Sequence, residues 1–219
     1  METIEWDMPL EQVLSYQPDL LILSTVDSMT GQLTDYEEIA PTYVFKPEDH
    51  NDIRQQIKII GEIVGKSDEA EARLNEYDSK VTEAKEQLVN TVGDETVAII
   101  WVAGDQYFMF EQDRHAAKVL YEELGLTPSA LTVELGAAEA NWNPISLEKL
   151  AELEADHLFL LAEEGVTGVD ALENSSVYQN LKAVQNDHVY HYTDPSNWTN
   201  KGIIAYEKTI EDVTEAFNN

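Results

Sequence analysis

The sequence predicts an α/β protein with two lobes joined by a long α-helix, and three observations lead to this fold class. Short apolar runs alternate with helix-periodic segments over residues 93–219, a pattern typical of parallel βα units. Residues 49–92 carry a single apolar stripe at helical spacing. A similar helix–strand pattern occurs once before that stripe and once after it. We therefore expect a partial N-terminal lobe over 1–48, a connecting long helix over 49–92 and a C-terminal lobe over 93–219.

The N-terminal region predicts one helix followed by one strand. Apolar residues at helical spacing begin at Leu10 and continue to Tyr16, and Pro18 ends the helix because proline cannot continue it. The apolar run 20–23 follows directly. A run this short after a helix breaker predicts a strand that is buried on both faces.

The connecting segment is predicted to be one continuous helix. Pairs with the acid first and a base four residues later, such as Glu76 and Lys80, support a helix. A coiled coil would show the same apolar stripe, and so would a helix that lies along the backs of two lobes and joins them. The stripe consists of Ala70, Leu74, Tyr77, Val81, Ala84 and Leu88.

The C-terminal region predicts a complete α/β lobe. Residues 97–102 (VAIIWV) form an apolar run typical of a buried strand, and residues 116–124 favour a helix that Gly125 caps. Ser146 is placed to cap the N-terminus of a helix that runs through Leu153. Further predicted elements are strands at 158–161 and 189–192 and a terminal helix over 200–217.

A weak internal repeat relates the two lobes. In each copy a helix with a glutamate in its first turn precedes an aspartate and then a strand, and one constant offset separates the copies. The matched pairs are Glu11 with Glu148, Asp19 with Asp156, and Leu23 with Leu160. Chance among common residues is the competing interpretation. Two similar lobes would leave a cleft between them, and such domain interfaces are favoured ligand sites.

The composition excludes several classes of function. The chain has 43 acidic and 13 basic residues and a formal net charge of -30, which repels nucleic acid and anionic membrane surfaces. It has no cysteine, so disulfides, thiolate metal sites and cysteine nucleophiles are excluded. No loop has the alternating oxygen ligands of a calcium site. The sequence also lacks a phosphate loop, a dinucleotide-binding glycine motif and a G-x-S-x-G nucleophile turn, and we expect no enzymatic activity.

The sequence contains no targeting signal. Met1 is followed by acidic residues rather than by a basic and then apolar stretch, and no run is long enough to span a bilayer. Two interpretations remain: the protein is cytoplasmic, or the sequence begins after its targeting segment.

Seven blocks in succession resemble the iron-siderophore substrate-binding proteins of ABC importers. They are PLEQVLSYQPDLLIL, YEEIAPTYVF, IKIIGEIVGKSDEAEARLNEY, AKVLYEELGL, ISLEKLAELEADHLFL, VYQNLKAVQNDHVYHY and WTNKGIIAYEKTIEDV. The resemblance covers essentially the whole chain. It implies two Rossmann-like lobes joined by a long α-helix, with the N-terminal lobe incomplete because family members carry an earlier section before the first block.

The resemblance also implies a function. A monomeric protein outside the cytoplasm, as a membrane lipoprotein or in the periplasm, captures a ferric siderophore of hydroxamate or carboxylate type in the interlobe cleft. It then delivers the siderophore to an ABC permease for iron uptake. The siderophore itself holds the iron, so no resident cofactor, no protein metal site and no nucleic-acid partner are expected. Small motions are expected, because a continuous connecting helix resists bending.

The resemblance assigns permease docking to Glu11 and Glu148, the two glutamates of the internal repeat. Each family lobe presents one glutamate to arginines of the permease, and carboxylate–guanidinium pairs are directional. A carboxylate near a helix N-terminus also stabilises its own helix, which is the alternative role of each residue.

The predicted ligand-binding residues are aromatic side chains and one arginine. A siderophore needs flat walls for its organic shell and donors for its exposed oxygens. Tyr107, Phe108 and Phe110 follow the strand at 97–102, and Arg114 comes next. Arg114 is equally interpreted as a surface residue paired with Glu111 or Asp113. Trp142 and Trp198 lie in polar loops and are predicted to be walls of the site or loop anchors, whereas Trp101 is predicted in the core.

Two alternative functions remain open. The same fold could bind haem or a cobalamin, in which case His115 or Tyr107 would be candidate axial ligands, although nothing in the sequence selects them. The histidines lack metal-site spacing. The chain could also be a sensor or adaptor without a transport role.

Overall fold

The computed structural model describes residues 7–26, 29–50, 52–139 and 141–218. The chain divides into two compact units, Met1–Leu74 and Asn75–Asn219, each of which is described by itself. The division falls inside a helix, not at the ends of the predicted connecting segment. The lobe boundaries at 48 and 92, the Rossmann-like character of both lobes and the interlobe cleft stay predictions.

The first unit begins with a small α/β element around a parallel strand pair. Its elements are α1 (Leu10–Ser15), β1 (Leu21–Leu23), α2 (Leu33–Glu37), β2 (Thr42–Val44) and η1 (Pro47–Asp49). β1 pairs with β2 in parallel, with Leu21 opposite Thr42. Tyr36 is fully buried in the small core, and its hydroxyl donates a hydrogen bond of 2.6 Å to the carbonyl of Met8.

The prediction that β1 is buried on both faces is wrong. Leu21 and Leu23 are buried, but Ile22 between them is 36% exposed. Successive side chains of a strand point to opposite sides. Among the described residues, β1 has a single partner strand, and the core covers the side that carries Leu21.

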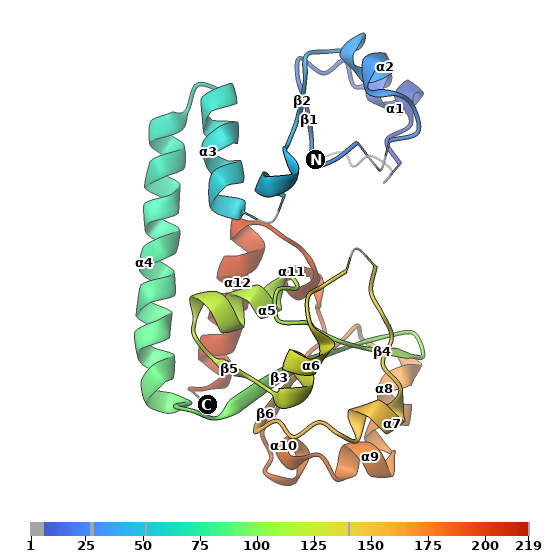
Figure 1. Cartoon of the computed structure of the whole chain (residues 1–219), viewed down its shortest axis with the longest axis vertical. Helices are drawn as coiled ribbons and strands as arrows, with labels where there is room; N and C mark the ends of the chain where they lie inside the picture. Colours follow the sequence, from blue (N-terminus) through green and yellow to red (C-terminus); the bar gives the residue numbers. More distant parts are fainter. Residues whose placement is uncertain (1–6, 27–28, 51, 140, 219) are drawn as a thin grey trace. The chain divides into compact units, whose positions relative to one another are not determined.

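The predicted single helix is also wrong, because two helices occupy the segment. They are α3 (Ile53–Ile63) and α4 (Ser67–Thr91). Gly65 ends α3 with a φ of 69°, a left-handed conformation that glycine adopts without steric cost. A Cβ added at Gly61 would lie 2.6 Å from the Cβ of Ala70, so α3 packs closely against the first turns of α4 (Figure 1).

The second unit is built on a mostly parallel sheet in the order β4-β3-β6-β7, with β5 pairing the start of β3. Its strands are β3 (Thr96–Ala103), β4 (Gln106–Met109), β5 (Thr127–Pro128), β6 (His157–Ala162) and β7 (Val189–Tyr192). Its helices are α5 (Ala116–Lys118), the π-helical turn η2 (Val119–Glu123), α6 (Ala130–Leu135), α7 (Leu147–Leu150), α8 (Thr167–Glu173), α9 (Ser176–Gln179), α10 (Lys182–Gln185), α11 (Ser196–Thr199) and α12 (Ile203–Ala216). β3, β6 and β7 are parallel to one another, whereas β4 is antiparallel to β3.

Both faces of this sheet are covered, so β3 and β6 are almost wholly buried. On one face Ile100 and Leu160 pack with residues from α7 to α10, such as Leu150 and Leu172. On the other face Phe159 contacts Trp198 of α11. Burial on both sides explains the unbroken apolar sequence of these strands.

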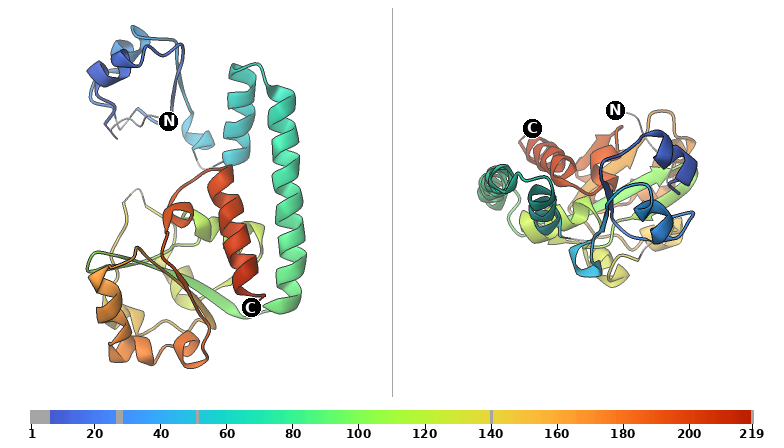
Figure 2. Two further views of the ribbon diagram at one scale, coloured as in Figure 1. Left: turned by 180° about the vertical axis from the view of Figure 1, so that it is seen from behind. Right: turned by 90° about the horizontal axis from the view of Figure 1, so that it is seen from above.

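The second part of α4 belongs to this unit. The hydroxyl of Tyr77 donates a hydrogen bond of 2.6 Å to Glu123, and Lys80 forms an ion pair of 3.2 Å with Glu207 of α12. Figure 2 shows α12 running beside this part of α4. The apolar stripe of α4 therefore packs against the C-terminal unit over at least part of its length, with Tyr77 and Leu88 buried.

Several local predictions are confirmed. The Ser146 side chain caps α7 by accepting a hydrogen bond of 3.2 Å from the backbone N–H of Lys149. Gly125 has a φ of 77° after the segment 116–124, although that segment is a short α-turn followed by a π-turn rather than a regular helix. Both copies of the internal repeat form a helix and then a strand, α1–β1 and α7–β6.

Candidate functional site

The topology of the sheet indicates where a ligand site is expected in the C-terminal unit. After β3 the chain forms the antiparallel strand β4 and then crosses to β5, which pairs with β3 on the side away from β6. After β6 the chain crosses to β7, which lies on the side of β6 away from β3. β3 and β6 are adjacent and parallel, so this is the point at which the strand order reverses. In open α/β sheets, ligands bind outside the carboxyl ends of the strands at such a point. The segments that follow Ala103 and Ala162 are therefore the relevant ones.

Four aromatic rings gather beside the carboxyl end of β3. Trp101 lies opposite Phe108 across the β3–β4 ladder, with 5.3 Å between ring centroids. Trp142 meets Trp101 at 5.1 Å and Phe110 at 4.9 Å, both edge-to-face. Phe108 and Phe110 are buried, but Trp101 and Trp142 are only partly covered. We call Trp101, Phe108, Phe110 and Trp142 the aromatic cluster; Trp101 belongs to it and not, as predicted, to the closed core.

Arg114 packs against the Trp142 ring of this cluster. The centre of its guanidinium is 4.3 Å from the centroid of the Trp142 ring, a cation–π distance. Its Nε and Nη2 donate hydrogen bonds to the carboxylate of Glu111. Nη2 also donates to the carbonyl oxygens of Glu139 and Asn141, at 3.0 and 3.2 Å. Arg114 therefore holds the backbone on either side of residue 140 against the end of β4.

The Arg114–Glu111 pair is the alternative that the sequence analysis named, but it is buried and not on the surface. The two residues are 4% and 7% exposed. A direct contact between the guanidinium and a ligand would require the pair or the covering loop to move. In the structure described, Arg114 positions Trp142, and its role as a ligand-binding residue stays a prediction.

His115 follows Arg114 and also faces Trp142, with 5.6 Å between the ring centroids. Its pKa is lowered to about 4, first by burial and then by the positive charges of Lys201 and Arg114. The pKa of Lys201 is lowered as well, by partial desolvation of a side chain whose residue is otherwise exposed and by the positive charges of Arg114 and Lys118. The sequence analysis named His115 only as a candidate haem ligand and missed Lys201, which is distant in sequence.

Two other predicted ligand residues lie outside the aromatic cluster. Tyr107 neighbours Phe108 in β4 and so points to the opposite face of the sheet, where it packs against the core. Its hydroxyl donates a long hydrogen bond of 3.4 Å to the carbonyl of Gly168. Trp198 is fully buried and its indole N–H donates to Asp212 at 3.0 Å. A ligand contact with Trp198 would require the chain to open.

The two predicted docking glutamates are both exposed and both lie in the first turn of a short helix. Glu11 is in α1 of the first unit, and Glu148 is in α7 of the second. The exposure of these two glutamates is compatible with docking to a permease and equally with stabilisation of the helix N-terminus by a carboxylate. Docking therefore stays a prediction.

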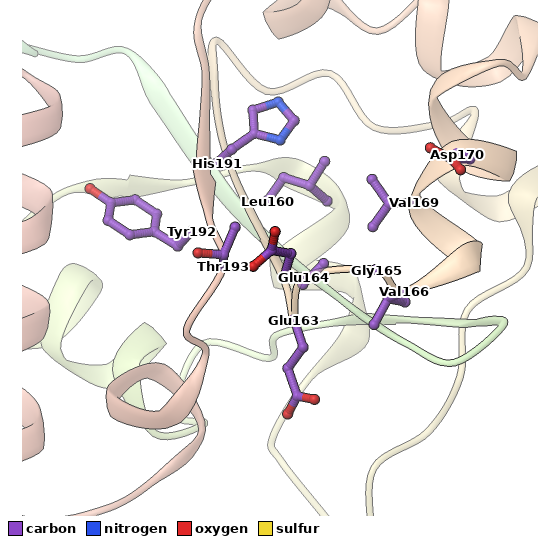
Figure 3. Close-up of a pocket in the computed structure, with 11 residues that line it drawn as sticks. Leu160, Glu163, Glu164, Gly165, Val166, Val169, Asp170, His191, Tyr192 and Thr193 are labelled. Carbon is purple, nitrogen blue, oxygen red and sulfur yellow. The ribbon is translucent and has the colours of Figure 1, made fainter.

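A pocket of about 260 Å³ lies at the carboxyl ends of β6 and β7 (Figure 3). Its apolar part includes Leu160, Val166 and Val169, and the polar side chains that line it include three acids. The sequence analysis missed this pocket because its residues come from β6, the loop before α8, α8 itself and the end of β7. The rule that ligands bind at the carboxyl ends of parallel strands is the signal that would have found it. The polar part of the lining consists of Glu163, Glu164, Asp170, His191, Tyr192 and Thr193.

Comparison with known proteins shows the family. Residues 5–195 match the family model described as periplasmic binding protein. The chain belongs to the periplasmic binding protein family. The predicted resemblance to siderophore-binding proteins of ABC transporters is confirmed, as is the prediction that the chain is a transport binding protein and not an enzyme.

Two of the similar proteins come from Bacillus subtilis. The chain is 31% identical to the iron(3+)-hydroxamate-binding protein FhuD over 218 residues, which is 99% of this chain and 68% of that protein. A solved structure of a FhuD fold-family component of a Fep/Fec-like ferrichrome ABC transporter matches with a TM-score of 0.81 and 31% identity. That match covers 96% of this chain and 76% of the solved one. The predicted α/β fold class agrees with this match.

A further similarity concerns the fold alone. FhuD2 from Staphylococcus aureus with bound ferrioxamine B matches with a TM-score of 0.78 and 23% identity, over 96% of this chain and 80% of that one. Across the first five curated relatives, the chain spans from 57% to 68% of their length. Some relatives are periplasmic and others are lipoproteins. In the part of the chain that the structure describes, no helix is long and apolar enough to cross a membrane.

Proposed function

We propose that this protein binds a ferric siderophore, of hydroxamate or carboxylate type, and delivers it to an ABC permease for iron uptake. It would act outside the cytoplasmic membrane, in the periplasm or as a lipoprotein. Family membership supports the transport role, and the names of the relatives support an iron chelate as the ligand.

The aromatic cluster is the observation that carries the proposal. In a ferric siderophore the oxygens of the siderophore occupy the coordination positions of the iron, so the protein binds an organic surface rather than the metal. Partly exposed rings provide flat apolar contact area at small entropic cost. Trp101 and Trp142 provide such rings, and they lie at the carboxyl end of β3, where the topology favours a ligand.

The experiment that tests this function is a fluorescence titration of the protein with ferrioxamine B, ferric citrate, haem and a cobalamin. We expect saturable quenching with micromolar or tighter affinity for one of the two iron chelates, because a bound ferric complex quenches a neighbouring indole. Trp142→Phe should lose much of that quenching. Trp198→Phe is the matched control and should retain it, because Trp198 is fully buried beneath β6 and β7.

The proposed function fails if neither iron chelate gives saturable quenching. Saturable quenching by haem or a cobalamin alone would show that the protein binds one of these alternative ligands instead of a siderophore. Equal loss of quenching in Trp198→Phe would place the ligand elsewhere than at the aromatic cluster.

Glu11 and Glu148 are proposed as the residues that contact the permease. Both are exposed at helix starts, and arginines of a partner would pair with them through charge-assisted hydrogen bonds. Neither residue belongs to the aromatic cluster, so permease docking and ligand capture would use different residues.

Replacing either glutamate with glutamine should weaken binding to the cognate permease by about tenfold, since a directional charge pair is lost. Affinity for the siderophore should not change. The measurement is binding of the loaded protein to permease in nanodiscs, with exposed Glu154→Gln as the control. Unchanged permease affinity in both Glu11→Gln and Glu148→Gln would leave these glutamates with a helix-stabilising role only.

A further inference from the structure

Another pocket of the C-terminal unit lies beside α7, the helix that carries Glu148. Its volume is about 410 Å³, and it is formed by the end of β4, the end of α6 and the segment that leads into α7. Ser146 and Lys149, at the start of α7, line the pocket and flank Glu148 in the sequence. A partner that binds Glu148 therefore comes close to the pocket. The apolar side chains of the lining are Met109, Leu135, Pro144 and Ile145.

The charges around this pocket favour a basic partner. The Lys149 ammonium donates hydrogen bonds to Glu134 at 2.8 Å and to Glu152 at 2.7 Å, so its charge is compensated within the chain. Glu148 is exposed and forms no ion pair within the part of the chain that the structure describes. Three glutamates against one lysine leave a surplus of two negative charges on this surface.

Contacts within the chain fix the walls of the pocket. Lys149 and Glu134 join α7 to α6, and the backbone N–H of Ile145 donates to the carbonyl of Tyr107 at 2.7 Å, which joins the segment before α7 to β4. A surface that is already ordered loses little conformational entropy when a partner binds. Glu111 is the remaining acid of the lining, and its pairing with Arg114 leaves it no uncompensated charge.

We propose that this pocket receives an apolar side chain of the permease, from the same segment whose arginine pairs with Glu148. The inference rests on the proposed permease docking and deepens it by naming what the partner inserts beside the charge pair. The charge pair orients the partner, and burial of the apolar side chain contributes binding energy. A second copy of this chain is disfavoured as the occupant, because each copy carries a net charge of -30.

The first test measures binding of the whole chain, loaded with the chelate that quenches its fluorescence, to the cognate permease in nanodiscs. Leu135→Gln places a polar group in the pocket and should weaken permease binding by about five- to tenfold, as the loss of one apolar contact in an interface core does. Val133→Gln is the matched control on α6, because Val133 is 52% exposed and does not line the pocket. It should leave permease affinity unchanged, and neither variant should alter affinity for the chelate.

A second measurement remains decisive if Leu135→Gln lowers the stability of the fold. The chain has no cysteine, so Leu135→Cys and Val133→Cys each introduce a single thiol. Leu135 is only partly buried, which leaves its replacement open to a maleimide. Permease in nanodiscs should slow the reaction of the thiol in Leu135→Cys by about fivefold or more, since a bound partner covers it. The thiol in Val133→Cys should react at the same rate with and without permease, and empty nanodiscs should protect neither.

The outcomes distinguish the pocket from the docking proposal. If Leu135→Gln binds permease as tightly as the unmodified protein, or if permease does not protect the thiol of Leu135→Cys, the pocket is overturned. Docking at Glu148 then still stands wherever Glu148→Gln weakens permease binding. Equal effects at positions 133 and 135 would also overturn insertion into the pocket. If neither Glu11→Gln nor Glu148→Gln weakens permease binding, the docking proposal fails and the pocket falls with it.

Discussion

Arg114→Met is expected to destabilise the protein by about 3–5 kcal/mol, because it leaves the Glu111 carboxylate buried without its partner. The two side chains are 3% and 9% exposed and are joined by two hydrogen bonds. The substitution also removes the donors to the carbonyl groups of Glu139 and Asn141. The free energy of unfolding, measured by urea denaturation, checks this expectation.

The control for Arg114→Met removes both charges together. The double variant with Glu111→Gln should recover part of the lost stability, since replacing a complete buried ion pair costs far less than breaking it. Lys66→Met breaks an ion pair whose side chains are 59% and 69% exposed, and it should have little effect. Wild-type stability in Arg114→Met would show that Glu111 is solvated, and the buried pair would then be wrong.

Trp198→Ala is expected to cost about 3–5 kcal/mol, the usual range for removing a fully buried aromatic side chain. The Trp198 ring lies 5.1 Å from Phe159 and 5.3 Å from Tyr192, centroid to centroid. Its N–H and the amide of Asn197 donate to Asp212, whose pKa is raised by burial. Thermal and urea unfolding measure the loss.

Trp198→Phe separates packing from hydrogen bonding. It keeps most of the apolar contact but leaves Asp212 with one donor fewer, so a smaller loss of about 1–3 kcal/mol is expected. A Trp198→Ala variant that keeps its stability but no longer binds the siderophore would instead support the original prediction that Trp198 is a wall of the site.

The strands of the C-terminal unit were predictable because burial on both faces leaves a plain signal in sequence. The runs at 97–102 and 158–161 contain almost no polar residue, and the caps at Ser146 and Gly125 depend only on local geometry. The break at Gly65 was missed because a single glycine is compatible with either a helix or its end. Its left-handed φ depends on how α3 packs against α4.

The sequence predicted which types of residue form the candidate site, but it predicted less well where each of them lies in the fold. Phe108 and Trp142 do meet, because β-pairing and the following loop bring them together. Tyr107 faces the other way, since alternation along β4 fixes the side of each residue once the register is known. Trp198 and Lys201 differ by three positions yet have opposite burial, which depends on how α11 and the following turn lie against the sheet. No local pattern records that arrangement.

The π-helical turn at η2 has a consequence for insertions and deletions in this part of the chain. A π-turn holds one residue more per turn than an α-helix, and each α-helical residue corresponds to about 100° of rotation. Leu124 accordingly bonds back to the carbonyl of Val119 at 2.9 Å. Deleting one residue within 119–123 could restore a regular helix while leaving Leu124 in the core. The residues before the turn, His115 among them, would then keep nearly their present orientation, because the five residues of an i→i+5 turn close one turn just as four residues do in an α-helix. A homologue with one residue fewer in this segment would therefore still present a histidine or its replacement to Trp142 from the same position, and the length difference would be confined to the turn itself.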